Sequence, residues 1–327
     1  MIASDEDPAD VSGAVAAPLA EVVRGDLVES VHLGHLLATG VGGNPVLTVG
    51  GADVVIWPRS SVKPLQAVAM VRHGLDLPDR LLALAAASHN GEPEHVAGAR
   101  EILALAGLDE SALQNTPDLP WGRRAERAWL AAGGGPERIT QNCSGKHAAM
   151  LLTCVTAGWD TGTYLEPGHP LQRAIRATVA ELTGVPVEHV SVDGCGAPLF
   201  STTVRGLARS FARLGSAGAA VARAMSAHPQ MVAGGQRPAT TLMRAIPGLV
   251  AKDGADGIFA AGMPDGRAVA FKVLDGAERP LAVALVAALD RLGVLDGPEV
   301  DRDAVEGLRE RPVLGGGRPV GTIRPAF

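Results

Sequence analysis

Residues 257–273 read GIFAAGMPDGRAVAFKV, and this stretch decides the fold. Two apolar runs, 257–263 and 267–273, flank Pro264-Asp265-Gly266, which is typical of two antiparallel strands joined by a tight turn. The residues from Leu19 to Trp57 have the same character, because apolar and polar side chains alternate loosely between glycine-rich breaks. Strands are therefore expected at both ends of the chain.

The sequence between these two ends has the pattern of helices. A helix is predicted to begin at Ser61 and to tolerate Pro64 in its first turn. Further helices are expected at 78–87, 93–106, 145–157, 168–183, 200–214, 216–227 and 279–293, and a last edge strand at 319–323. Strands at both ends and a helical middle predict an α+β fold, with one mixed antiparallel sheet, helices packed on it and a helical lobe alongside.

The chain is expected to form one domain. Residues 1–17 are rich in Asp, Ala and Pro without periodicity, which predicts a disordered tail. Residues 18–327 contain no repeat and no low-complexity linker, so we expect a single domain there.

Composition excludes several classes of protein. The 327 residues are 46% hydrophobic and 20% charged, which is ordinary for a globular protein. A net charge of −6 argues against a nucleic-acid partner. No apolar run reaches the roughly 18 residues of a membrane span, and the acidic start is unlike a secretory leader. Three cysteines cannot build a disulfide framework, so a cytoplasmic enzyme with a small-molecule substrate is expected.

Lysine is scarce: only four of the 29 basic residues are lysines, at positions 63, 146, 252 and 272. An ammonium can lose its proton in a buried site, whereas a guanidinium stays charged. Ser60 and Lys63 form Ser-x-x-Lys, about one helical turn apart, so a neutral amine there could take the serine proton. The plainer alternative is an N-cap serine followed by a surface lysine.

Two further motifs carry groups that could act with this pair. Lys252-Asp253-Gly254 precedes the C-terminal hairpin, as Lys-x-Gly does in serine acyl-enzymes that carry Ser-x-x-Lys. A solvated turn lysine is the alternative. Ser88-His89-Asn90-Gly91-Glu92 follows a very apolar helix, so its polar side chains could line a pocket, or Asn90-Gly91 could simply end the helix.

Two of the three cysteines lie beside glycines. Cys143 is followed by Lys146 and His147, and Cys195 stands between two glycines. Two thiolates are a good beginning for a zinc site, although Lys146 is an unusual ligand. A nucleophilic Cys143 and two inert buried thiols remain alternatives.

Taken together, these motifs resemble the L-asparaginase II family, the rhizobial-type asparaginases, from about Leu19 to Phe327. The resemblance is carried by RSSVKPLQ at 59–66, ASHNGE at 87–92, NCSGKHA at 142–148 and DGCGAP at 193–198. It implies a fold like that of serine β-lactamases and glutaminases, a homodimer, and hydrolysis of L-asparagine to L-aspartate and ammonia.

The resemblance also implies roles for individual residues. Two catalytic Ser–Lys pairs, Ser60 with Lys63 and Ser88 with Lys252, are expected beside Zn²⁺ held by Cys143, Lys146 and Cys195. Lys272 competes with Lys252 for the second pair. Ser60 is expected to attack the side-chain amide and to form an acyl-enzyme.

Substrate-binding groups are expected at Arg59, His89, Asn90 and Asp193. They would hold the α-carboxylate and the α-ammonium of the substrate. The alternatives are a glutaminase or other serine amidase of the same fold, and a non-catalytic homologue that binds zinc or an amino acid.

Overall fold

The computed structural model describes residues 15–327. Residues 1–14 of the predicted tail lie outside the described residues. Strand β1 begins at Ala17, which is the last residue of the predicted tail. No helix in this part of the chain is long and apolar enough to cross a membrane.

One large sheet draws its strands from both ends of the chain, as predicted. Its strand order is β11-β12-β1-β2-β10-β9-β8, β3 also pairs with β2, and every pairing is antiparallel. The strands are β1 (Ala17–Arg24), β2 (Leu27–Thr39), β3 (Pro45–Val49), β8 (Val250–Gly254), β9 (Ile258–Gly262), β10 (Ala268–Val273), β11 (Arg311–Gly315) and β12 (Arg318–Pro325).

The predicted hairpin lies inside this sheet, between β2 and the edge strand β8. Val269 of β10 is paired with Ala261 of β9 on one side and with Ala38 of β2 on the other. These strands are buried on both faces, which explains why they are nearly continuous apolar runs rather than alternating ones.

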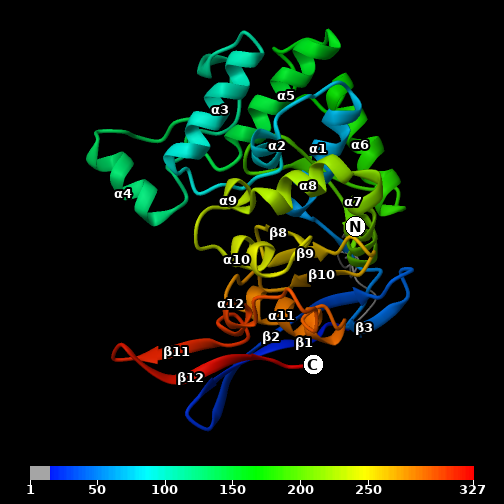
Figure 1. Ribbon diagram of the computed structural model, residues 1–327, viewed down its shortest axis with the longest axis vertical. Coiled ribbons are helices and arrows are strands. Elements are labelled where there is room, and N and C mark those ends of the chain that lie inside the picture. The colour runs from blue at the N-terminus through cyan, green and yellow to red at the C-terminus, as the bar shows by residue number, and fades with distance from the viewer. Residues whose placement is uncertain (1–14) are drawn as a thin grey trace, which may run out of the picture.

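The helices form a lobe above the sheet and a layer against it (Figure 1). Helix α7 contacts β9 and β10, and α11 contacts β12 and β10. The helices are α1 (Lys63–Arg72), α2 (Asp79–Ala85), α3 (Pro93–Leu105), α4 (Arg123–Ala131), α5 (Ser144–Ala157), α6 (Pro170–Thr183), α7 (Val204–Ala217), α8 (Ala219–Ala227), α9 (Pro229–Val232), α10 (Pro238–Ala245), α11 (Leu281–Arg291) and α12 (Arg302–Glu306). The α+β architecture is therefore confirmed.

The predicted helix at 200–214 begins four residues late, because its first residues are extended. Thr202 and Thr203 form the short strand β7 (Thr202–Thr203), which pairs with β4 (Val55–Ile56). Thr203 then caps α7 by accepting a hydrogen bond from the Gly206 amide at 3.0 Å. Strand β5 (Val190–Val192) pairs with β6 (Pro198–Phe200) just before it.

Two helices of the lobe are buried almost completely around their circumference. In α1 the residues from Lys63 to Met70 are buried, and in α5 those from Ser144 to Cys154. Both helices begin with polar side chains and continue with apolar ones. Their apolar turns anchor them in the core, so Lys63 and Lys146 are held inside the protein at the first turn of each helix.

Candidate active site

The segments just before α1 and α5 line a small cavity of about 170 Å³. Loops far apart in the sequence complete its wall. It is lined by Arg59, Ser60, Ser88, Asp118, Trp121, Gln141, Asn142, Cys143, Asp193, Gly194, Cys195, Asp253, Gly254 and Ala255. Residues from all four motifs of the sequence analysis and from Lys252-Asp253-Gly254 therefore meet at one place.

Ser60 lies half-buried in a short 3-10 turn, Arg59–Val62, between β4 and α1. Arg59 before it has a φ of +49°, a left-handed conformation that side chains other than glycine rarely adopt. Two ion pairs hold its guanidinium. Nε donates to Asp193 at 2.8 Å, and Nη1 donates to Asp256.

The buried amine of Lys63 makes three hydrogen bonds inside the protein. Its Nζ donates to the Ala87 carbonyl at 2.7 Å, to Ser88 Oγ at 2.8 Å and to Cys143 Sγ at 3.0 Å. An ammonium has three donors, and in the described part of the chain none of the three goes to Ser60. Lys63 therefore contacts the second predicted serine, while Ser60 faces the same cavity.

Ser88 is fixed in place by its backbone. Its amide donates to the Val232 carbonyl at 2.9 Å, and the next amide, of His89, donates to the Asn142 carbonyl at 3.0 Å. These bonds tie the end of α2 to the lobe and to the loop before α5. The Ser88 hydroxyl is thereby held against Lys63.

Lys252 lies one layer behind the cavity. Its fully buried Nζ donates to the carbonyl of Asp253 at 2.6 Å and to Asp253 Oδ1 at 2.9 Å. Burial lowers the pKa of Lys252 to about 8, and the charges of Lys63 and Arg237 add to this, whereas Asp253 opposes it. Lys272 lines a different cavity.

Arg237 links Lys252 to Ser88. It donates to the Ser88 carbonyl at 2.8 Å, forms an ion pair with Asp253, and lies over the Trp121 ring at 4.9 Å. Burial opposes ionisation of Asp253, but the charges of Arg237 and Lys252 outweigh it and hold the pKa of that carboxyl far below its usual range. Ser88 and Lys252 therefore meet through this bridge, and no direct hydrogen bond joins their side chains in residues 15–327.

The two thiols and Lys146 form a compact group in the cavity wall. Lys146 Nζ lies 3.1 Å from Cys195 Sγ, and Cys143 and Cys195 pack together. The neighbouring Cys195 and burial raise the pKa of Cys143 to about 12, whereas the neighbouring Cys143 and the Lys146 charge lower the pKa of Cys195 well below its usual value. One thiolate is therefore favoured, and the Lys146 ammonium neutralises it.

This donor set fits a zinc ion. Two soft sulfurs and one nitrogen, all buried and convergent, are ligand types that zinc accepts, and the cavity beside them leaves one side open. Metal binding needs deprotonated ligands, so zinc would displace one proton from Cys143 and one from Lys146. A second cluster, Glu92, Glu94 and His95, is less suited, because the His95 nitrogens bond the Glu92 amide and the Gln230 carbonyl.

Asp193 supplies a fixed negative charge. Its Oδ1 accepts from Arg59 and from the Gly194 amide at 2.9 Å. Burial would raise the pKa of this carboxyl, but Lys146 and Arg59 outweigh burial and lower it. The cavity therefore presents an ionised carboxylate next to a guanidinium.

His89 and Asn90 do not line this cavity. His89 is fully buried, with Nε2 at 3.0 Å from Ser144 Oγ and Nδ1 accepting from the Gly91 amide. Asn90 donates to Glu92 at 3.2 Å. Both side chains support the loop that carries Ser88 and lie behind the surface that a substrate would touch.

Sequence reasoning missed several lining or supporting residues. Gln141 accepts from the Cys143 amide at 3.0 Å, and Asn142 accepts from Cys143 Sγ at 2.9 Å. Asp253 was visible only as the middle residue of Lys-Asp-Gly. Arg237 had no local signal, because its partners Ser88 and Asp253 come from other parts of the chain.

Comparisons with solved structures give weak likenesses. A crystal structure of a β-lactamase from Mycobacterium bovis is 18% identical, with 80% of this chain and 93% of that chain covered and a TM-score of 0.37. Two crystal structures of Mglu are 15% and 16% identical, with TM-scores of 0.35 and 0.34; they cover 80% and 86% of this chain and 60% and 65% of their own. These TM-scores are too low to carry an argument. No curated protein matches the chain.

The comparison with protein families is decisive. The model described as L-asparaginase II matches residues 20–325, which include every residue of the cavity wall. The chain therefore belongs to the L-asparaginase II family.

Proposed function

We propose that the protein hydrolyses L-asparagine to L-aspartate and ammonia through a serine acyl-enzyme. Membership of the L-asparaginase II family supports an amidohydrolase of the asparaginase type. The observation that carries the finer proposal is the small cavity itself. It combines two serine hydroxyls, a buried lysine bonded to one of them, and an ionised carboxylate beside a guanidinium.

The charged pair suits the α-groups of an amino acid. Asp193 would accept a hydrogen bond from the α-ammonium. In the described chain Arg59 uses Nε and Nη1 on carboxylates, and Nη2 has no protein acceptor, which leaves it for the α-carboxylate. A volume of about 170 Å³ suits a small amino acid.

The serine chemistry follows from the positions of the hydroxyls. Ser60 attacks the side-chain carbonyl carbon, the Lys63 amine accepts its proton by way of the Ser88 hydroxyl, and a tetrahedral oxyanion forms. Collapse breaks the C–N bond while Lys63, through its contact with Ser88, returns the proton to the leaving nitrogen as ammonia. Water then attacks the ester, giving aspartate and restoring Ser60.

Lys252, Asp253 and Arg237 act behind this pair. The Asp253 carboxylate pairs with both cations, so neither of these positive charges is isolated in a site where an unpaired charge would be costly.

We propose Zn²⁺ on Cys143, Lys146 and Cys195. Bound there, the ion would supply a Lewis acid at the cavity wall. Neighbouring residues position the proposed ligands. Gln141 accepts a hydrogen bond from the Cys143 amide, and the loop after β5 carries Cys195 two residues after Asp193. The resemblance further implies a homodimer, and the three free cysteines suit a reducing cytoplasm.

The test measures ammonia release and the site of acylation. Purified protein is assayed with L-asparagine and L-glutamine, and an acyl-enzyme trapped by rapid acid quench is mapped by peptide mass spectrometry. We expect asparagine turnover and an aspartyl adduct on the peptide that carries Ser60. An adduct on Ser88 would reassign the nucleophile to the hydroxyl that Lys63 contacts.

Two other results would replace the proposal. Faster turnover of glutamine or of another amide would make the protein a different serine amidase. Binding of asparagine without ammonia release, in a zinc-loaded sample, would make it a non-catalytic homologue.

A further inference from the structure

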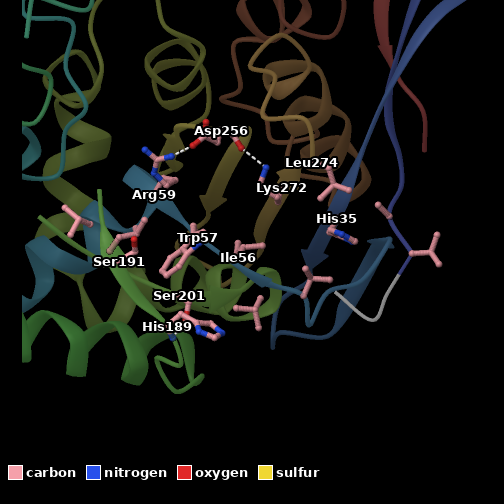
Figure 2. Close-up of a pocket in the computed structure, with 16 residues that line it drawn as sticks. His35, Ile56, Trp57, Arg59, His189, Ser191, Ser201, Asp256, Lys272 and Leu274 are labelled. Carbon is pink, nitrogen blue, oxygen red and sulfur yellow. Dashed lines mark hydrogen bonds and ion pairs between the residues drawn. The ribbon is translucent and has the colours of Figure 1, made fainter. Parts of the chain in front are cut away.

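A second and larger cavity lies on the other side of Arg59. Its volume is about 940 Å³, within the range of small-molecule sites. Figure 2 shows Arg59 and Asp256 at one end, with Lys272 and His35 along the wall. It is lined by Val15, Ala16, His35, Val54, Val55, Ile56, Trp57, Arg59, His189, Ser191, Val192, Leu199, Ser201, Asp256, Lys272 and Leu274.

Most of the lining is apolar, but two donors stand together on the sheet. Lys272 of β10 and His35 of β2 are direct cross-strand partners. Lys272 Nζ donates to the carbonyls of Asp256 and Val273, which leaves one of its three N–H groups. His35 Nδ1 accepts from the Gly51 amide at 2.9 Å, so the ring proton is on Nε2. One wall therefore offers two free donors to a ligand.

The charges in the lining favour an anion. Lys272 and Arg59 are cationic, and Asp256 is the single acidic residue among the lining residues. A carboxylate can accept two hydrogen bonds from neighbouring donors, and its attached chain can cover apolar surface. We propose that this cavity binds a small amphipathic organic anion, with its acidic head on Lys272 and His35 and its apolar body against Val54, Trp57 and Leu199.

Arg59 connects this cavity to the catalytic one, because it lines both. Its partner Asp256 also has a left-handed φ, +56°. Two residues other than glycine are thus held in a strained backbone by each other's charge. Lys272 anchors the same turn through the Asp256 carbonyl at 2.8 Å. The proposed anion site on Lys272 therefore adjoins the turn that holds Arg59, one residue before Ser60.

The main rival occupant is a second copy of the chain. Val192 is 67% exposed and Leu274 is 51% exposed at the rim, and both would be covered in a dimer formed across this face. The charges at the base favour the small anion over an apolar protein face. The experiment must separate the two.

The experiment titrates the full chain with decanoate by isothermal titration calorimetry, beside decan-1-ol and acetate. We expect one decanoate to bind per chain. Decanol and acetate should each bind at least about tenfold more weakly, because the carboxylate and the alkyl chain of decanoate both contribute to affinity. Lys272→Met should weaken decanoate about tenfold and leave decanol unchanged. This readout is binding, so it stands whether or not asparagine is hydrolysed.

A second pair of variants tests where decanoate binds. Val192→Glu places a negative charge at the exposed rim of the cavity. Leu314→Glu is the matched control on the remote strand β11, where the side chain is 57% exposed. Only Val192→Glu should weaken the binding of decanoate. The site is refuted if decanoate fails to bind, if decanol binds as tightly, or if both variants behave alike. A wild-type dimer that Val192→Glu dissociates in sedimentation would assign the cavity to a second copy instead.

Discussion

The two cavities that share Arg59 differ in how their polar groups are satisfied. Around the smaller one, buried charged groups are hydrogen-bonded to protein partners, as in Lys63 with Ser88 and Arg237 with Asp253. In the larger one, apolar side chains dominate and donors are left free. Paired groups are preorganised for chemistry, whereas apolar walls with few donors suit binding. The difference indicates that the smaller cavity is built for a reaction.

The sharpest test of this comparison exchanges one lysine from each cavity for methionine. Lys63→Met removes the proposed base and should lower kcat for asparagine by about three orders of magnitude. Lys272→Met should change kcat by less than about threefold, since binding interactions away from the reacting atoms mainly affect affinity. Steady-state ammonia assays measure both, and equal losses would remove the functional distinction between the cavities.

The thiols of the catalytic wall can be compared with the one in the core. Cys195→Ala should remove bound zinc, because only one thiolate would remain. Cys154→Ala, in the buried interior of α5, should keep it. Elemental analysis of proteins purified with zinc measures the metal per chain. Zinc retained by Cys195→Ala would remove that thiol from the metal site.

The paired cations of the smaller cavity should also stabilise the fold more than surface pairs do. Arg237→Met leaves buried Asp253 with Lys252 as its remaining cationic partner and should cost about 2 kcal/mol of unfolding free energy. Arg24→Met, from an exposed pair with Glu29, should cost about 0.5 kcal/mol or less. Urea denaturation compares the two, and similar costs would show that burial of the Arg237 pair is unimportant.

The pKa of Lys252 makes a smaller, pH-dependent prediction. Burial lowers this pKa from 10.5 to about 8, so between these values the unfolded chain holds the proton more often than the folded one. Stability contributed by this site should therefore rise with pH from about 8 to 10.5, by up to about 3 kcal/mol. Urea denaturation of wild type and Lys252→Met across that window isolates the effect. A stability difference that does not change with pH would contradict the lowered pKa.

Much of the fold was predictable from local patterns. The hairpin at 257–273 and the helices of the lobe have the apolar periodicity, proline starts and glycine stops that their conformations require. Strand β7 was mistaken for helix because Thr202 and Thr203 follow an apolar run. Their extended conformation depends on pairing with β4, which lies far away in the sequence.

The candidate site was predictable as a set of residues but not as a set of contacts. The scarcity of lysine and the short motifs identified Ser60, Lys63, Ser88, Cys143 and Cys195, all of which meet at or beside one cavity. The contact between Lys63 and Ser88 was not foreseen, since spacing along a helix favoured Ser60 as the partner.

The sequence by itself determined the hairpin of β9 and β10, most of the long helices, and which few side chains carry unusual chemistry. Only the tertiary structure decided that Lys63 faces Ser88, that Arg237 bridges Ser88 and Asp253, and that Arg59 separates two cavities. The physical reason is the sequence distance over which each kind of interaction acts. Backbone conformation responds to neighbours within a few residues, whereas the partner of a buried charge is whichever group the packed core brings within about 3 Å.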